Sequence, residues 1–124
     1  MNTIESLISA YRNGTAKPNE VVRRFLDKIE ANNDYYSAYQ SVWAEEAMAL
    51  ADSATKAQNA GQELRPLHGI PIAIKDIFHV SGKITTCGSM ELIDNVSDRT
   101  STVVKRLIDA GAIILGKTKT VECA

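Results

Sequence analysis

The sequence lacks the features that mark secreted, membrane-spanning and nucleic-acid-binding proteins. Its 124 residues have a formal net charge of −1, so no broad positive field is available to attract nucleic acid or an anionic membrane. There is no run of eighteen apolar residues, and the first residues have neither the basic nor the apolar segment of a secretory signal. We therefore expect a cytoplasmic protein that neither enters membranes nor contacts nucleic acid directly.

Metal-binding and redox patterns are equally sparse. The chain contains only two cysteines, Cys87 and Cys123, and two histidines, His68 and His79, which form neither a C-x-x-C nor an H-E-x-x-H pattern. We expect both cysteines to be reduced thiols, as is usual in the cytoplasm, and both histidines to have loop roles. The sequence thus predicts no metal site and no cofactor.

A serine nucleophile has no recognisable place either. None of the serines lies in a Gly-x-Ser-x-Gly elbow or a similar context. Ser89, which follows Gly88, comes nearest to one, and we interpret it as a loop residue that makes local backbone hydrogen bonds. Because serine hydrolysis needs an activated hydroxyl and an adjacent base, we do not expect these residues alone to catalyse it.

What the sequence does contain is a helical first half. Apolar residues at helical spacing predict a helix that stops near Gly14, and Pro18 is well placed to open a second one. Lys17 stands where a Ser or Thr cap would be preferred, which weakens the start of the second helix. The expected elements of residues 1–61 are helices from 4, from 18 and over 44–58, and a short strand over 39–43.

The most informative residue is Lys75, which ends an apolar strand-like run in the second half of the chain. Ile70, Ile72 and Ile74 alternate with smaller residues, as in a strand leaving a core, and the run then stops at this charge. Burying an ammonium there would be costly unless it found partners or gave up its proton. Burial can also turn a lysine into a general base near neutral pH. Lys75 is therefore our candidate catalytic residue.

The rest of residues 62–124 predicts a loop, a helix and a second strand. Thr100 or Ser101 can cap the helix, and Gly111 suits a left-handed helix end. Residues 112–115 are wholly apolar, as in a strand buried in a parallel sheet. Strand, crossover helix and strand form a βαβ unit, so the sequence predicts an α/β fold of at most one domain.

Residues 111–118 match the phosphate-binding pattern G-x-x-x-x-G-K-[ST], but we interpret the match as fortuitous. A phosphate loop follows a strand and keeps its amides free, whereas here a predicted helix precedes Gly111 and the four middle residues are apolar. Amides that pair in a sheet cannot also bind a triphosphate. We therefore predict no nucleotide binding and expect Lys117 to be a structural or site-lining charge.

Several segments of the second half resemble, in order and spacing, the amidase signature family, serine hydrolases that use a Ser–cis-Ser–Lys triad. They are LHGIPIAIKD at 67–76, GKITTCGS at 82–89, VVKRL at 103–107, AGAIILGKT at 110–118 and ECA at 122–124. The resemblance implies that residues 1–124 are the N-terminal portion of a single amidase domain with a mixed-sheet α/β/α fold. It also implies that Lys75 takes a proton from the cis-serine. Both serines would lie beyond Ala124, so this chain alone is expected to be inactive.

The chain departs from the family pattern at three places. It has Thr100-Ser101 where members usually carry Asp-Ala, Lys119 where Asn is common and Cys123 where Phe is usual. The substrate and the subfamily therefore stay open. The resemblance favours hydrolysis of a small carboxamide to a carboxylate and ammonia. The alternatives are an amidase-type subunit of a glutamyl-tRNA(Gln) amidotransferase and a truncated, non-enzymatic relative. A homo-oligomer of the full-length protein is compatible with the sequence, which gives no oligomeric state.

Overall fold

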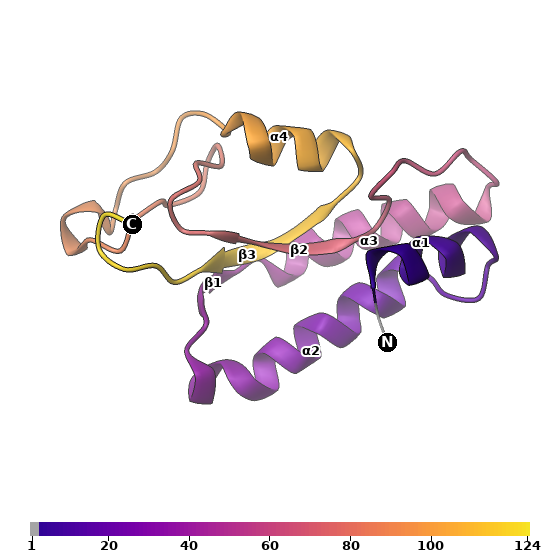
Figure 1. The fold of residues 1–124 in the computed structure, drawn as a ribbon, viewed down its shortest axis with the longest axis horizontal. Helices are drawn as coiled ribbons and strands as arrows, with labels where there is room; N and C mark the ends of the chain where they lie inside the picture. The colour runs from indigo at the N-terminus through magenta and orange to yellow at the C-terminus, as the bar shows by residue number, and fades with distance from the viewer. Residues whose placement is uncertain (1–2) are drawn as a thin grey trace.

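A computed structural model describes residues 3–124, in which helices cover both faces of one small mixed sheet (Figure 1). The strands are β1 (Tyr39–Val42), β2 (Pro71–Lys75) and β3 (Ile113–Thr118). The helices are α1 (Ile4–Arg12), α2 (Pro18–Tyr36), α3 (Ala44–Asn59) and α4 (Thr102–Asp109), with a 3-10 turn η1 at Met90–Leu92. The predicted α/β class and the order of helices followed by a βαβ unit are confirmed. No helix within residues 3–124 combines the length and the apolar character needed to cross a membrane.

The first two helices begin as their sequences predict. Thr3 caps α1, because its hydroxyl accepts a hydrogen bond from the Ser6 amide at 3.1 Å and its amide donates to the Ser6 hydroxyl at 2.9 Å. Pro18 occupies the first turn of α2, whereas Lys17 makes no capping hydrogen bond with its side chain. Buried side chains at helical spacing then hold α1 and α2 against the core: Leu7, Ile8, Tyr11, Val21, Val22 and Leu26.

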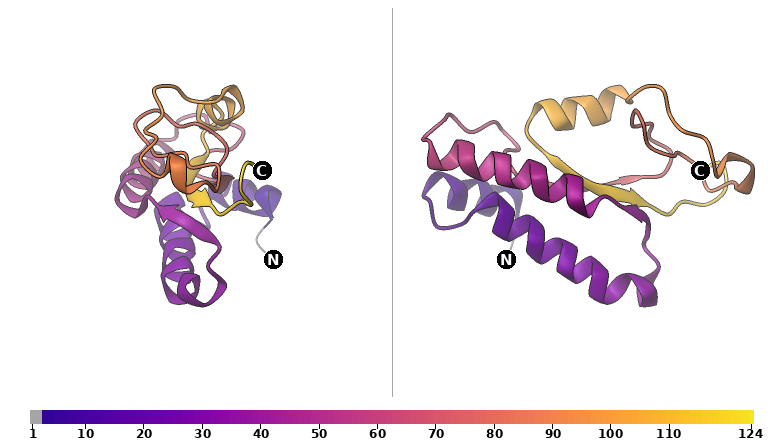
Figure 2. Two further views of the ribbon diagram at one scale, coloured as in Figure 1. Left: turned by 90° about the vertical axis from the view of Figure 1, so that its left-hand side faces the viewer. Right: turned by 180° about the vertical axis from the view of Figure 1, so that it is seen from behind.

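The sheet has the strand order β1-β3-β2, so β3 lies at its centre. Strands β2 and β3 run parallel and are joined through α4, whereas β1 pairs antiparallel with β3. Ile113 and Leu115 pack with residues of α2 and α3, and Ile114 packs on the opposite face with Val104 of α4 (Figure 2). The central strand is therefore buried on both faces, as its unbroken apolar run predicts.

Gly116 allows β1 to approach β3 closely. A Cβ atom at this position would lie only 2.1 Å from the carbonyl oxygen of Ser41 in β1. The pairing of β2 with β3 also skips Leu115, so the register shifts immediately before Gly116. A residue without a side chain is needed here for the three strands to form one sheet.

The segment between β2 and α4 is irregular but closely tied. Backbone hydrogen bonds join its two halves, and η1 turns the chain between them. Ser101 stands at the N-cap position of α4, but its hydroxyl does not cap the helix and instead accepts a hydrogen bond from the His79 amide at 2.9 Å. The hydroxyl of Thr100 likewise accepts from the Ser81 amide at 3.0 Å. The predicted cap is therefore wrong in its chemistry, because both hydroxyls bind the loop that follows β2.

Candidate active site

The carboxyl ends of the parallel strands β2 and β3 meet at one edge of the sheet, where Lys75 is the last residue of β2. Its partner across the pair is Thr118, the last residue of β3. Open α/β sheets bind their ligands at such an edge. Lys75 is exposed, and within residues 3–124 its ammonium makes no hydrogen bond or ion pair. The strand and its end are where the sequence predicts them.

The expected burial of Lys75, by contrast, does not occur within residues 3–124. Side chains alternate between the two faces of a strand, and Ile74 packs on the face that α4 covers. Lys75 therefore points to the other face together with Ala73, which is exposed as well. No segment among the described residues covers this end of β2, so any desolvation of the ammonium has to come from outside them.

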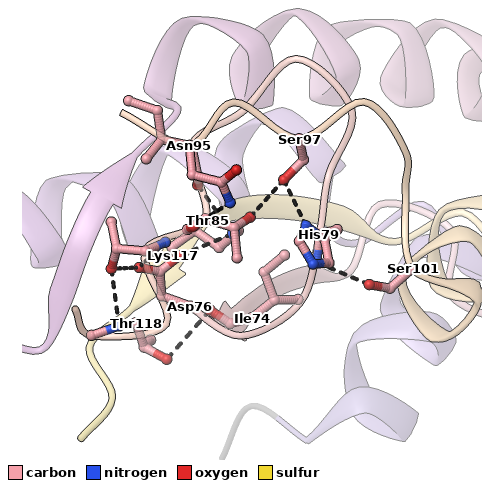
Figure 3. Close-up of polar contacts among 12 residues, drawn as sticks. Ile74, Asp76, His79, Thr85, Asn95, Ser97, Ser101, Lys117 and Thr118 are labelled. Carbon is pink, nitrogen blue, oxygen red and sulfur yellow. Dashed lines mark hydrogen bonds and ion pairs between the residues drawn. The ribbon is translucent and has the colours of Figure 1, made fainter. Parts of the chain in front are cut away.

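The lysine that the fold does bury is Lys117 in β3. Its side chain is 0% exposed, and its Nζ donates to Asp76 Oδ1 at 3.0 Å, to Thr85 Oγ1 at 2.9 Å and to the Ile84 carbonyl at 3.2 Å (Figure 3). An ammonium has three protons, so these hydrogen bonds satisfy it fully. A buried charge is tolerated when it is paired and hydrogen-bonded in this way.

Asp76 is the counter-ion of Lys117 and connects several parts of the chain. Its Oδ2 accepts hydrogen bonds from the amide of Thr86 at 3.2 Å and from the Thr86 hydroxyl. Its amide donates to the Thr118 carbonyl at 2.9 Å, and its carbonyl accepts from the Cys87 amide at 3.0 Å. One buried residue therefore ties β2 to β3 and to the turn that contains Thr86 and Cys87.

A second ring of polar groups surrounds this pair (Figure 3). The hydroxyls of Thr85 and Ser97 lie 2.9 Å apart, and the Ser97 hydroxyl lies 2.9 Å from Nδ1 of His79. The amide group of Asn95 donates to the Thr85 carbonyl at 2.9 Å. His79, expected only as a loop residue, thus belongs to a continuous network that ends on Lys117.

Ser89 is not placed as a nucleophile. Its hydroxyl donates to Glu122 Oε1 at 3.1 Å, so the prediction of local backbone contacts is wrong for its side chain, although its amide donates to the Thr86 carbonyl at 2.9 Å. Ser89 also lines a pocket of about 150 Å³ at this edge of the sheet, together with Asp76 and Thr86. Ligand pockets usually measure ~300 Å³ or more, so this one does not enclose a substrate by itself.

The remaining candidate ligands stay apart. Cys87 is half-buried and Cys123 is exposed, and both are free thiols. His68 is buried, with its Nε2 2.9 Å from the Ala54 carbonyl. Within residues 3–124, no three His, Cys, Asp or Glu side chains gather where they could hold a metal ion.

Residues 111–118 do not form a phosphate loop. Gly111, with a φ of +101°, follows the end of α4, and the chain then enters β3, whose backbone pairs with β1 and β2. The ammonium of Lys117 binds Asp76 and the loop instead. The strand predicted for this motif is confirmed.

Comparison with known proteins places the whole arrangement. A family model described as Amidase matches residues 20–124. The chain belongs to the amidase signature family. It is 38% identical over 122 residues to the amidase-type component of the mitochondrial glutamyl-tRNA(Gln) amidotransferase of Rattus norvegicus, covering 98% of this chain and 23% of that relative. It is 37% identical over 105 residues to an acylamidase of Rhodococcus erythropolis, covering 85% of this chain and 22% of that relative.

The fold of this amidase chain agrees with the sequence relationship. The solved peptide amidase of Stenotrophomonas maltophilia superimposes with a TM-score of 0.90 at 27% identity, covering 99% of this chain and 26% of that one. The family resemblance seen in the sequence is thus confirmed, and the relatives include both amidases and amidotransferase subunits. The chain spans about a quarter of the length of these relatives.

The network around Lys117 was not predicted from the sequence. A signal was available, because two apolar strands that lead to Asp76 and Lys117 place opposite charges at the same sheet edge. What the sequence does not display is the register that brings the two charges into contact.

Proposed function

We propose that these residues form the N-terminal part of an amidase domain that hydrolyses a small carboxamide to a carboxylate and ammonia, with Lys75 as general base. The position of Lys75 carries the proposal, because its uncommitted ammonium ends β2 at the ligand-binding edge of the sheet. The other two lysines there are engaged: Lys117 is fully hydrogen-bonded, and Lys119 contacts the Ser37 hydroxyl. A base must be free to exchange a proton with a neighbouring hydroxyl.

In the proposed reaction, the neutral amine of Lys75 accepts the proton of a bridging cis-serine, which in turn accepts the proton of the nucleophilic serine. The nucleophile attacks the carbonyl carbon, the C–N bond breaks, and the nitrogen leaves as ammonia with a proton returned along the same path. Water then cleaves the acyl ester and releases the carboxylate. Both serines would come from parts of the domain outside these 124 residues, which would be inactive alone.

A second function is favoured by the 38% identity to a component of a glutamyl-tRNA(Gln) amidotransferase. In this alternative the same cleavage releases ammonia from glutamine, and a partner protein holds the misacylated tRNA that receives it. The requirement for that partner distinguishes the two functions. The third alternative is a truncated relative without activity.

The proposed setting is the cytoplasm, supported by two cysteines that remain free thiols. The proposed ligand is a small amide. Direct binding of nucleic acid is not proposed, since the net charge of −1 offers no broad positive field. Whether the full-length protein is a homo-oligomer can be measured by light scattering on the same samples.

The test uses the full-length gene product and follows ammonia release from an aryl amide, a peptide amide and glutamine. Lys75→Ala is expected to lower kcat by ~10²–10⁴-fold, the usual contribution of a general base, with an unchanged thermal midpoint. Lys119→Ala is the matched control, because Lys119 is an exposed lysine just beyond β3. We expect it to retain nearly full activity.

Each result has a distinct meaning. Near-normal turnover by Lys75→Ala would contradict the role of Lys75. Ammonia release that depends on tRNA and a partner protein would favour the amidotransferase. A folded full-length protein that cleaves none of the three amides, with or without partners, would favour the non-enzymatic relative.

A further inference from the structure

We propose that Lys117 and Asp76 form a positioning pair that holds the end of β2, so that Lys75 meets its hydroxyl partner at the correct distance. The inference rests on the proposed function of Lys75 and adds two residues to it. Neither member of the pair is proposed to touch substrate, and both act through the backbone next to Lys75.

Lys117 is unsuited to proton transfer itself. All three of its N–H groups have acceptors at 2.9–3.2 Å, and its side chain is 0% exposed. To reach a substrate or a serine hydroxyl it would have to leave Asp76 and open the loop at Thr85. Lys75 makes no hydrogen bond or ion pair within residues 3–124, so the two neighbouring lysines have separate tasks.

Asp76 transmits the fixation because it follows Lys75 directly in the chain. Its amide is bound by the Thr118 carbonyl at 2.9 Å and its carbonyl by the Cys87 amide at 3.0 Å. Its carboxylate is held by Lys117 at 3.0 Å on the buried side. The backbone on the carboxyl side of Lys75 is therefore fixed to β3 and to the turn, while the side chain of Lys75 stays free to move.

Stability alone does not account for this arrangement. Replacing a buried ion pair by apolar residues of similar volume is often neutral or even stabilising. The geometry of a catalytic group is far more sensitive, because a displacement of ~1 Å can lower a rate ~10²-fold. Two buried charges and a ring of hydroxyls immediately beside the proposed base are what accurate placement requires.

The experiment replaces the pair in the full-length protein by an apolar pair, Asp76→Leu with Lys117→Met, which leaves no unpaired charge. We expect a folded protein whose kcat falls ~10²-fold while KM changes little, because substrate contacts are untouched and only the base is displaced. Adding the same pair of substitutions to Lys75→Ala is expected to cause little further loss, since the pair acts through Lys75.

Two single substitutions keep the test decisive if the apolar pair does not fold. Thr85→Val preserves shape and removes one acceptor of Lys117, and we expect a smaller loss of kcat with an unchanged KM. Thr55→Val is the matched control, because Thr55 is also a buried threonine whose hydroxyl bonds backbone groups, but it lies in α3. We expect its kcat to match that of the parent protein.

The outcomes separate the positioning role from the proposed function. If Lys75→Ala keeps its activity, the proposed function fails first. If Lys75→Ala is inactive but the folded apolar pair, or Thr85→Val in its place, has normal kcat, only the positioning role is overturned. The role is also overturned if the pair lowers the residual rate of Lys75→Ala as strongly as it lowers the parent rate. Where that residual rate is too low to measure, the comparison of kcat with KM decides.

Discussion

Replacing Gly116 by alanine tests whether β1, β2 and β3 are packed as closely as the structure indicates. The added Cβ would lie 2.1 Å from the Ser41 carbonyl oxygen and 2.9 Å from the Cα of Val42, both backbone atoms of β1. Carbon and oxygen approach one another to ~3.3 Å, so β1 would have to move by about 1.2 Å. No flexible side chain is available to absorb this movement.

The cost of Gly116→Ala can be estimated from its parts. Overpacking a tight contact typically costs ~1–3 kcal/mol, and the displacement strains the hydrogen bond from the Trp43 amide to the Leu115 carbonyl, worth ~0.5–1.5 kcal/mol. The φ of +155° adds backbone strain of ~1 kcal/mol for alanine. We therefore expect a loss of ~3–5 kcal/mol in the free energy of unfolding.

Gly61→Ala is the matched control. Gly61 also has a positive φ, +69°, but an added Cβ there would meet nothing within 4 Å. Only the left-handed strain remains, and the expected loss is ~1–2 kcal/mol. Urea unfolding of both variants in the same protein measures the difference directly. Losses within ~0.5 kcal/mol of each other would refute the close approach of β1 to β3, because the two variants would then share backbone strain alone.

Two further predictions concern residues away from the proposed base. Burial raises the pKa of Tyr11 from near 10 to about 12, although Arg24 opposes the shift, so the stability contributed by its neutral hydroxyl is intact below pH ~10 and fades as the pH rises toward ~12. The difference in unfolding free energy between the parent and Tyr11→Phe should therefore vary with pH only in that window, and a flat difference would contradict the burial. ATP with magnesium should leave the thermal midpoint unchanged, because the amides of residues 113–118 pair in the sheet, and a concentration-dependent rise would show that the motif binds phosphate after all.

The helices and strands were predictable because local patterns and tertiary burial agree in this chain. Pro18 opens α2, the alternation before Lys75 marks β2, and the apolar run over 112–115 marks the central strand. The cap of α4 was not predictable in the same way. Whether Ser101 binds its own helix or the amide of His79 depends on where a distant loop lies, and sequence spacing carries no such information.

The site was predictable in identity but not in environment. Lys75 is selected by family resemblance, whereas the physical argument from burial describes Lys117 instead. A lysine at a strand end looks the same in sequence whether its face is covered or open. Coverage is decided by elements far along the chain, and for Lys75 those elements lie outside residues 3–124.

The burial of Lys117 depends on an irregularity in β3 that hydrophobic patterning cannot reveal. Ile114 packs toward α4, and strict alternation would send the side chain three residues later to the opposite face. The register shift before Gly116 adds one residue to β3 relative to β2, which changes the phase of the strand. Lys117 can then meet Asp76, which follows Ile74, another residue packed with α4, by two positions. Gly116 is the visible trace of that shift, since it both admits β1 and marks the point after which the strand faces the other way.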